Sequence, residues 1–468
     1  MNSAIRIVSI CLSFLFLFRV LIWANEVHQT QHRYTNTIDN YTKPEPSMVT
    51  DVLGGGQFGF GSDTPPLVWY AGIGCDSSGF FNEIAALLSG LHPLLPRDKL
   101  RVKIGKCSDQ FLSTLIPQEA RVLADLQKAN LMETGIIWQD SVVVQHKLPG
   151  QPFSPLFSRG SVTRPLYLIG RVMTESIAVP KSEVLFLETV DEIWVPTSFH
   201  ADVYVRHGVK AEKLFVVPPA VDVQFFAAAT RLGVRIPPIH PESPVAITEP
   251  SSSFRLVSVF KWEHRKAPEL LLDAYWRAFS LSTHPTVELV LRSYKPHWEP
   301  GPADIDMRIS ELAIELTGLP RNELPPVVWL RDEMSKQDLR SLYQTSQVFV
   351  LPTRGEGFCL PCVEAMAAGL PIIVTNFSGP SDYLQESHSY PLKYAPQLNM
   401  DGSVEPDISH LSNLMQAAHS NPALNAAKGS AARKHATAHY SLNVVASTVC
   451  RRLMSIHQTI RVGKEKDM

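Results

Sequence analysis

Two glutamates with seven residues between them, Glu356 and Glu364, carry the clearest chemistry in the sequence. They lie in the segment TRGEGFCLPCVEAMAAGLPIIVTNFSGPSDY at 353–383. A helix is expected to begin near Pro361, because proline is favoured at the first position of a helix. The free N–H groups at that helix N-terminus suit a phosphate, and a carboxylate on each side can accept hydrogen bonds from sugar hydroxyls. The pattern therefore predicts a site for a sugar-linked diphosphate.

Three cations, Lys261, Arg265 and Lys266, follow the apolar run FRLVSVF at 254–260. A loop directly after a parallel strand lies at the strand's carboxyl end, where ligands bind in open α/β sheets. A cluster of cations there suits a diphosphate. The alternative is a solvated loop that happens to be basic.

A glycine-rich turn at 72–79, which includes Gly74, follows the apolar run LVWYAG and precedes the helical pattern FFNEIAALLSGL. A strand, such a turn and then a helix let backbone N–H groups approach a polar ligand. A tight strand-to-helix turn with no ligand is an equally weighted alternative.

Three polar residues follow two further expected strands of the first half. His146 comes just after SVVVQ, and Arg171 and Glu175 come just after LYLIG. The ends of parallel strands meet at one edge of a sheet, so these side chains are expected to face the same edge as the glycine-rich turn. A buried histidine with satisfied nitrogens is the alternative for His146.

Short apolar runs alternate with helical patterns through both halves of the chain, which indicates parallel sheets covered by helices. The fold class is therefore α/β, with two doubly wound Rossmann-like domains facing each other across a cleft. A proline-rich stretch between the halves is interpreted as a linker without structural elements, and the last apolar segment as an amphipathic helix. The expected divisions are an N-terminal domain at 65–217, a linker at 218–253, a C-terminal domain at 254–440, and a helix and tail at 441–468.

The motifs together resemble family 4 glycosyltransferases, of the glycosyl transferases group 1 type. The paired glutamates with EAMAAGLPIIVTNFSG are similar to the donor-site motif of that family, and WEHRKAP resembles its basic loop. GRVMTES, VDEIWVPTSFHADVYVRHGV and PPAVDVQFF in the first half are also similar, so that the likeness covers about 67–445. It implies the two-domain GT-B fold and transfer of a hexose, with retention of configuration, from a UDP- or GDP-linked donor to a glycan, lipid or protein acceptor.

The resemblance also implies a role for each candidate site residue. Glu364 would hold the ribose hydroxyls, and Glu356 would lie beside the transferred sugar. Lys266, with Arg265 or Lys261, would neutralise the leaving diphosphate. His146 would face the acceptor or the donor sugar, and further donor contacts would come from Gly357, Phe358, Cys359, Leu360, Gly74 and Glu175.

The chain departs from the family pattern in three places. Ser258-Val259 stands where a glycine–arginine pair is usual, so the second phosphate cation stays open between Lys261 and Arg265. Ala267 and Ala220 replace a common glycine and glutamate. The resemblance implies neither a metal nor another cofactor, and the D-x-D at 304–306 is interpreted as a helix cap.

Composition narrows the class of protein. A formal net charge of -2 gives no electrostatic reason to expect a nucleic-acid partner. Hydrophobic residues make up 45% of the chain, which is typical of a folded globular protein. The six cysteines do not indicate a disulfide framework, and the lone C-x-x-C of Cys359 and Cys362 is interpreted as two small packed side chains rather than a metal or redox site.

The N-terminal apolar segment at 7–24, IVSICLSFLFLFRVLIWA, indicates a signal anchor at 1–24, with a cleaved signal peptide and secretion as the alternative. A polar, glycine-containing stretch at 25–64 is interpreted as a flexible stem. This layout predicts a single-pass type II protein of the Golgi or endoplasmic reticulum, held at the membrane by its N-terminal segment.

Two other classes of protein compete with the transferase. A nicotinamide oxidoreductase is disfavoured because no segment supplies G-x-G-x-x-G with a following acidic residue. Among enzymes, a sugar phosphorylase or a phosphate-accepting relative is a further alternative. A catalytically inactive sugar-nucleotide-binding protein of the same fold stays open as the alternative.

Overall fold

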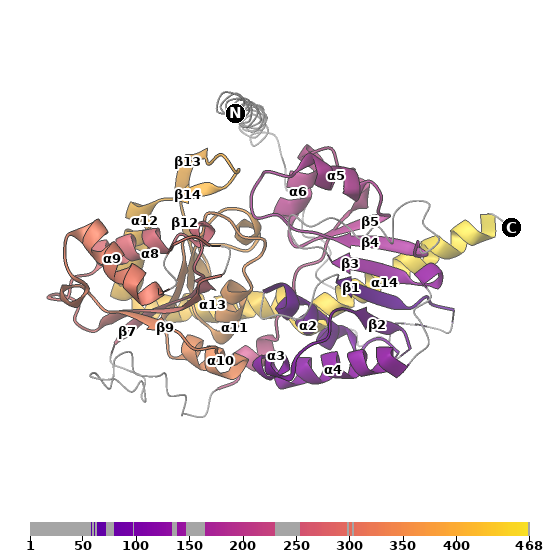
Figure 1. The fold of residues 1–468 in the computed structure, drawn as a ribbon, viewed down its shortest axis with the longest axis horizontal. Coiled ribbons are helices and arrows are strands. Elements are labelled where there is room, and N and C mark those ends of the chain that lie inside the picture. The colour runs from indigo at the N-terminus through magenta and orange to yellow at the C-terminus, as the bar shows by residue number, and fades with distance from the viewer. Residues whose placement is uncertain are drawn as a thin grey trace, which may run out of the picture.

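The computed structural model describes residues 58, 60, 63–71, 79–96, 98–132, 138–146, 164–229, 253–296, 299–301 and 304–466. Two lobes, each built on a six-stranded parallel sheet, stand side by side (Figure 1). The predicted fold class, two doubly wound α/β domains, is confirmed. The segments predicted as anchor and stem lie outside these ranges, apart from a few residues just before the first strand.

The first lobe alternates strands and helices as the apolar pattern predicts. Its elements are β1 (Leu67–Ala71), α2 (Gly79–Leu91), β2 (Leu100–Lys103), α3 (Asp109–Thr114), α4 (Pro117–Met132), β3 (Val142–His146), β4 (Tyr167–Arg171), α5 (Lys181–Leu187), β5 (Glu192–Val195), α6 (Ser198–Arg206) and β6 (Leu214–Val216). The strand order is β2-β1-β3-β4-β5-β6.

The second lobe repeats the arrangement and adds a small hairpin. Its elements are α7 (Val223–Ala227), β7 (Phe254–Lys261), α8 (Pro268–Ala278), β8 (Val287–Tyr294), α9 (Ile305–Thr317), β9 (Val327–Leu330), α10 (Lys336–Gln344), β10 (Val348–Leu351), α11 (Leu360–Ala368), β11 (Ile372–Thr375), β12 (Ser389–Leu392), β13 (Tyr394–Leu398), β14 (Val404–Pro406), α12 (Ile408–Ser420) and α13 (Pro422–Tyr440).

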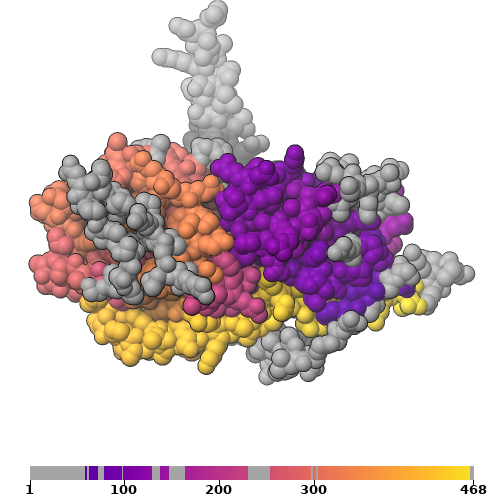
Figure 2. Space-filling view, turned by 90° about the horizontal axis from the view of Figure 1, so that it is seen from below, coloured from indigo at the N-terminus to yellow at the C-terminus, as the bar shows by residue number. Residues whose placement is uncertain are grey.

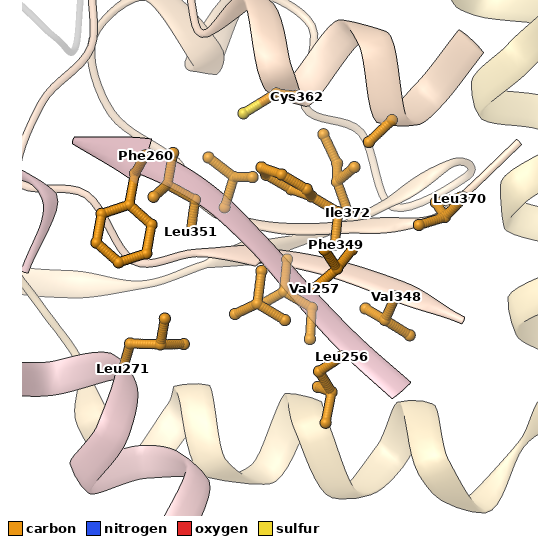
Figure 3. Packing of buried hydrophobic residues seen from close by; sticks show 14 of the residues in the cluster. Leu256, Val257, Phe260, Leu271, Val348, Phe349, Leu351, Cys362, Leu370 and Ile372 are labelled. Carbon is orange, nitrogen blue, oxygen red and sulfur yellow. The ribbon is translucent and has the colours of Figure 1, made fainter. Parts of the chain in front are cut away.

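The central strands of the second sheet are apolar on both faces, because helices cover both of them. β10 and β11 are buried along their whole lengths. Figure 3 shows Val257 of β7, Phe349 of β10 and Ile372 of β11 packed together, with Cys362 of α11 on one side. Local signals fix the helix starts: Asp304 caps α9 by accepting backbone N–H groups, which confirms the interpretation of the D-x-D.

The order of the second sheet, β12-β11-β10-β7-β8-β9, reverses direction between β10 and β7. Ligands of doubly wound sheets bind at such a switch point, beyond the carboxyl ends of the strands. β7 ends at Lys261 and leads into the basic loop, while β10 ends at Leu351 and leads to Glu356. The topology therefore brings together two motifs that are about 90 residues apart in the sequence.

The chain crosses between the lobes twice, and the two crossings touch. The first lies inside the predicted linker 218–253, where α7 buries Val223 and Phe226 in the core of the second lobe. The linker therefore does contain a structural element, although one too short to show a helical period. The second crossing lies at Tyr440 and Ser441. The two crossings touch there, because the Val221 N–H donates to the Tyr440 carbonyl at 2.8 Å and Val221 forms a β-bridge with Ser441.

The last helix, α14 (Leu442–Lys466), returns to the first lobe. Its Val445, Ala446 and Val449 lie in the same core cluster as α2. Arg452 binds both carboxylate oxygens of Glu192 on β5, at 2.8 and 2.6 Å. Figure 2 shows this yellow C-terminal part of the chain running along both lobes.

Candidate active site

A cavity of 780 Å³ lies between the lobes, at the carboxyl ends of both sheets. The first lobe lines it with Phe80, Glu83 and Met173, among others. The second lobe lines it from the loop after β7, the loop after β10 and the first turn of α11. Such a cavity is large enough for a nucleotide-sized ligand.

Glu356 and the basic loop meet inside this cavity. Lys266 Nζ forms an ion pair with Glu356 Oε1, and Arg265 Nη1 lies 3.4 Å from Glu356 Oε2. Burial opposes ionisation of Glu356, but the two cations outweigh it and lower the pKa of the carboxyl below its usual value. Burial and Arg265 together lower the pKa of Lys266.

Arg265 also joins the two lobes. Its Nη2 lies 2.9 Å from Glu175 of the first lobe and 2.7 Å from Glu263 on its own loop. In this way three carboxylates surround the two cations Arg265 and Lys266. An anionic ligand with several oxygen atoms could take the place of these carboxylates without any change in the positions of the cations.

Glu364, the second glutamate of the pair, is held by two side chains of α10. Lys336 Nζ forms an ion pair with Glu364 Oε1, and the Tyr343 hydroxyl donates to Oε2 at 3.3 Å. A capping box between Ser335 and Asp338 fixes the start of α10 and so places Lys336 at its first position. Glu364 is only 4% exposed and lines the cavity.

The N-terminus of α11 lies at the cavity wall, since Gly357, Phe358, Cys359 and Leu360 all line it. The Phe358 carbonyl accepts the Tyr383 hydroxyl at 2.8 Å. Cys359 forms a disulfide with Cys362, so the interpretation of this C-x-x-C as two packed thiols is wrong. The spacing allowed either state, and only the backbone geometry of the turn brings the two sulfur atoms together.

Close backbone contacts hold the glutamate loop in place. A Cβ on Gly355 would collide with the Glu175 carbonyl of the first lobe, and a Cβ on Gly379 would collide with the Gly357 carbonyl. The Glu356 N–H donates to Ser378 Oγ at 2.8 Å. Glycine is needed at both positions because the backbones approach too closely for a side chain.

His146 does not line the cavity. It is 3% exposed beneath Phe80, whose ring centroid lies 4.0 Å away, and its Nε2 lies 3.9 Å from Glu83 Oε2. Burial and Arg171 lower the pKa of His146 well below its usual value, so the imidazole is neutral. Glu83 itself lines the cavity and binds Arg171 through Nε at 3.0 Å and Nη2 at 2.7 Å.

The remaining sequence candidates divide into two groups. Lys261 and Glu175 line the cavity with the residues above. Gly74 lies outside the described residues. The structure thus brings together Lys261, Arg265, Lys266, Glu356, Glu364, Glu175 and the first turn of α11, and it places His146 one layer behind.

Known proteins resemble this chain in part of its sequence and in its overall fold. The sequence model of the family described as "Glycosyl transferases group 1" matches residues 324–397, which include both glutamates. D-inositol 3-phosphate glycosyltransferase of Streptomyces coelicolor (strain ATCC BAA-471 / A3(2) / M145) is 26% identical over 271 residues, covering 57% of this chain and 54% of the relative. That of Arthrobacter sp. (strain FB24) is 24% identical over 245 residues, covering 50% and 49%. Residues 324–397 of this chain are therefore similar to the group 1 glycosyltransferases.

Solved structures show that this chain has the GT-B fold. Anabaena HepE in complex with UDP and glucose has a TM-score of 0.58 at 13% identity, and the match covers 83% of this chain and 100% of HepE. Sucrose-phosphate synthase from Thermosynechococcus elongatus has a TM-score of 0.55 at 14% identity, covering 84% and 100%. The chain spans about half the length of the curated relatives it matches.

The predicted location of this chain in the Golgi or endoplasmic reticulum is wrong. The curated relatives above come from bacteria, which lack both compartments. Across the described residues, none of the helices combines the length and apolar character that a membrane crossing requires. The prediction was based on the apolar segment at 7–24, which lies outside those residues.

Sequence reasoning missed several cavity residues of the second lobe. The sequence did not mark Lys336 as a site residue, because it lies in neither the glutamate motif nor the basic loop. Its contact with Glu364 depends on how α10 packs beside α11. Arg292, Tyr294 and Glu333 line the cavity beyond Lys336, at the ends of β8 and β9. Arg292 and Tyr294 lie at the end of β8, and Glu333 follows β9, and these positions were the signal that could have identified them.

Proposed function

We propose that this chain is an active retaining hexosyltransferase, which takes a sugar from a UDP- or GDP-linked donor and transfers it to a glycan, lipid or protein acceptor. The observation that carries the proposal is the ion pair of Lys266 and Glu356 beside the N-terminus of α11, inside the cavity between the lobes. Cations, carboxylates and free backbone N–H groups in this arrangement match the parts of a nucleotide sugar.

Lys266 and Arg265 would bind the diphosphate, with Lys261 at the end of β7 as a further cation. The backbone N–H groups from Gly357 to Leu360 would add hydrogen bonds from the helix terminus. Before the donor binds, Glu356, Glu175 and Glu263 balance the charge of the buried cations and hold them in position. Positive charge is thus already in place where the leaving group becomes more negative, which is the main source of stabilisation in such reactions.

The two glutamates would orient the two ends of the donor. Glu364, fixed by Lys336 and Tyr343, would accept hydrogen bonds from the ribose hydroxyls. Glu356 would accept them from the transferred sugar, and Glu175 would contact the donor from the first lobe. His146 lies behind Glu83, so we assign it a positioning role that acts through that carboxylate.

In the reaction, the bond from the anomeric carbon to the diphosphate oxygen breaks through an oxocarbenium-like state. The acceptor hydroxyl attacks the same face, and its proton passes to the departing diphosphate. Lys266 and Arg265 supply the charge that a metal ion would otherwise supply, so we propose that no metal is required. Full activity after treatment with a chelator would support this point, and loss that is restored by Mg²⁺ would contradict it.

A donor panel tests the function. The full chain is mixed with UDP, GDP and their hexose conjugates, and the shift in thermal unfolding and the transfer or release of sugar are measured. Stabilisation by one nucleotide together with sugar transfer supports the proposal. Stabilisation without any transfer or hydrolysis would favour the inactive sugar-nucleotide-binding protein, and no stabilisation by any donor would contradict both.

A further inference from the structure

The first turn of α11 is closed by a covalent bond next to the cavity. Cys359 precedes the helix and forms a disulfide with Cys362, three residues later. Cys359 lines the cavity, whereas Cys362 is fully buried against the second sheet (Figure 3). Cys359, although only 6% exposed, is therefore the member of the pair that borders the cavity, and Cys362 is enclosed in the core of the lobe.

Cys359 also has an unfavourable backbone conformation. Its φ of 69° lies in the left-handed region, which non-glycine residues adopt at a cost of about 1–3 kcal/mol. Among the described residues, the other non-glycine positions with positive φ are Ala267 and Ser378. Ala267 follows Lys266, and Ser378 accepts the Glu356 N–H, so all three strained residues surround the same site.

The disulfide helps to hold Cys359 in this conformation. The bond ties residue 359 to a helix position that is fixed in the core, and the Cys362 N–H also points to Cys359 Sγ at 3.3 Å. Without the bond, residue 359 could relax toward an extended conformation, and the N–H groups of the first turn would lose their common direction.

We propose that Cys359 and Cys362 form a redox-active pair, and that the oxidised state binds the nucleotide donor more tightly than the reduced state. The second part of this inference rests on the proposed function, because it assigns the donor diphosphate to the N-terminus of α11. The pair is thus a covalent modification site within the donor site.

The chemistry is a thiol–disulfide exchange with an external dithiol. A thiolate of the dithiol attacks Cys359 Sγ from the cavity, the bond to Cys362 breaks, and Cys362 leaves as a thiolate that takes up a proton. The second thiol of the reductant then displaces Cys359, which gives two cysteine thiols and one oxidised reductant. The two electrons and two protons of the dithiol are transferred to the pair, and the reverse reaction restores the bond.

Binding and reduction must affect each other equally. If reduction weakens nucleotide binding by a certain factor, bound nucleotide disfavours reduction by the same factor. Couplings between sites are typically about 5- to 150-fold. A tenfold coupling would lower the midpoint potential of the pair by about 30 mV when nucleotide is bound.

The test uses the full chain and the variant Cys359→Ser/Cys362→Ser. Both are equilibrated in dithiol–disulfide buffers, the thiols are alkylated and mapped by mass, and the affinities for UDP and GDP are measured in each state. We expect the oxidised protein to bind nucleotide at least about fivefold more tightly than the reduced protein. The variant should bind nucleotide with the affinity of the reduced protein, and this affinity should not change with the dithiol–disulfide buffer. The buried free thiol of Cys450 serves as the alkylation control.

Four outcomes would contradict the inference. The first is the absence of a Cys359–Cys362 disulfide under oxidising conditions, and the second is equal affinity in both states. The third is a variant that responds to dithiol as the wild type does, which would assign the effect to another bond, such as that of Cys107. The fourth is no nucleotide binding in either state, which contradicts the coupling and the proposed function together, while the alkylation pattern still shows whether the pair is redox-active.

Discussion

Lys336 and Glu364 lie on neighbouring helices and form an ion pair inside the cavity. The lysine is the first residue of α10, and the glutamate belongs to α11, whose N-terminus faces the proposed diphosphate site. Glu364 is buried, and its ion pair with Lys336 fixes the orientation of its carboxylate. Lys336 is therefore a positioning residue for the proposed ribose contact.

Replacing Lys336 should weaken donor binding. Lys336→Met leaves a buried carboxylate without its cation, and charge-assisted hydrogen bonds are worth about 1.5–3 kcal/mol, so the nucleotide Kd should rise about tenfold or more. Lys336→Arg should recover most of the affinity. Isothermal titration with the nucleotide that the donor panel selects measures both, and Lys393→Met, at an exposed position of the same lobe, is the control. Wild-type affinity in Lys336→Met would refute the assignment.

Removing the cation beside Glu356 should affect the reaction rate more than the fold. Lys266→Ala is expected to lower kcat by about 10²–10³, because it deletes preorganised positive charge at the leaving group. Steady-state kinetics and circular dichroism measure the two effects. A folded Lys266→Ala protein with unchanged kcat would show that the diphosphate binds elsewhere.

Stability should depend on pH through Glu119 in the first turn of α4. Burial raises the pKa of this carboxyl to about 7, against 4.5 for the free group, although Lys336 opposes the shift. The folded protein then holds a proton that the unfolded chain loses, so the free energy of unfolding should fall as pH rises from about 4.5 to 7 and level off above that.

The variant Glu119→Gln should remove this decrease of the free energy of unfolding with rising pH. At pH 8 it should be more stable than the wild type by up to about 3 kcal/mol, which is the free-energy equivalent of the pKa difference, and near pH 4 the two should be similar. Urea unfolding at both pH values measures the difference. Glu212→Gln, at an exposed site of the same lobe, should show no comparable pH-dependent gain. An equal effect of Glu119→Gln at both pH values would exclude this explanation.

A methyl group at Gly355 should push the lobes apart. The added Cβ would collide with the Glu175 carbonyl of the first lobe, and such overpacking typically costs about 1–3 kcal/mol. Gly355→Ala should therefore lower transfer activity and shift small-angle scattering toward a more open molecule. Gly463→Ala, which would meet no atoms within 4 Å, is the control. A closed and fully active Gly355→Ala protein would mean that this contact does not limit closure.

The sequence was sufficient to predict motifs whose polar residues lie close together along the chain. Glu356 and Lys266 were expected near each other because each lies on the loop after a strand with a strong apolar pattern, and Glu364 because it lies in the helix that follows Glu356; parallel topology brings the strand ends together. The overall α/β arrangement could be predicted for the same reason.

Features that depend on packing between distant segments could not be predicted. The partner of Glu364 on α10 and the layer of Phe80 and Glu83 over His146 are both set by tertiary contacts. The disulfide of Cys359 depends on a left-handed residue that the sequence does not indicate, since cysteine rarely adopts that conformation. The amphipathic pattern of α14 predicted a helix but could not tell which lobe would cover its apolar face.

The paired crossings at Val221 and Ser441 have a consequence for how the two lobes can move relative to each other. Lobes joined by one tether can swivel freely, whereas two adjacent tethers held by a hydrogen bond allow little besides bending about the line between them. Opening should then be a hinge motion of the two lobes about this line. The first half of the sequence alone does not contain a complete first lobe, because the final helix completes the lobe with which the chain began.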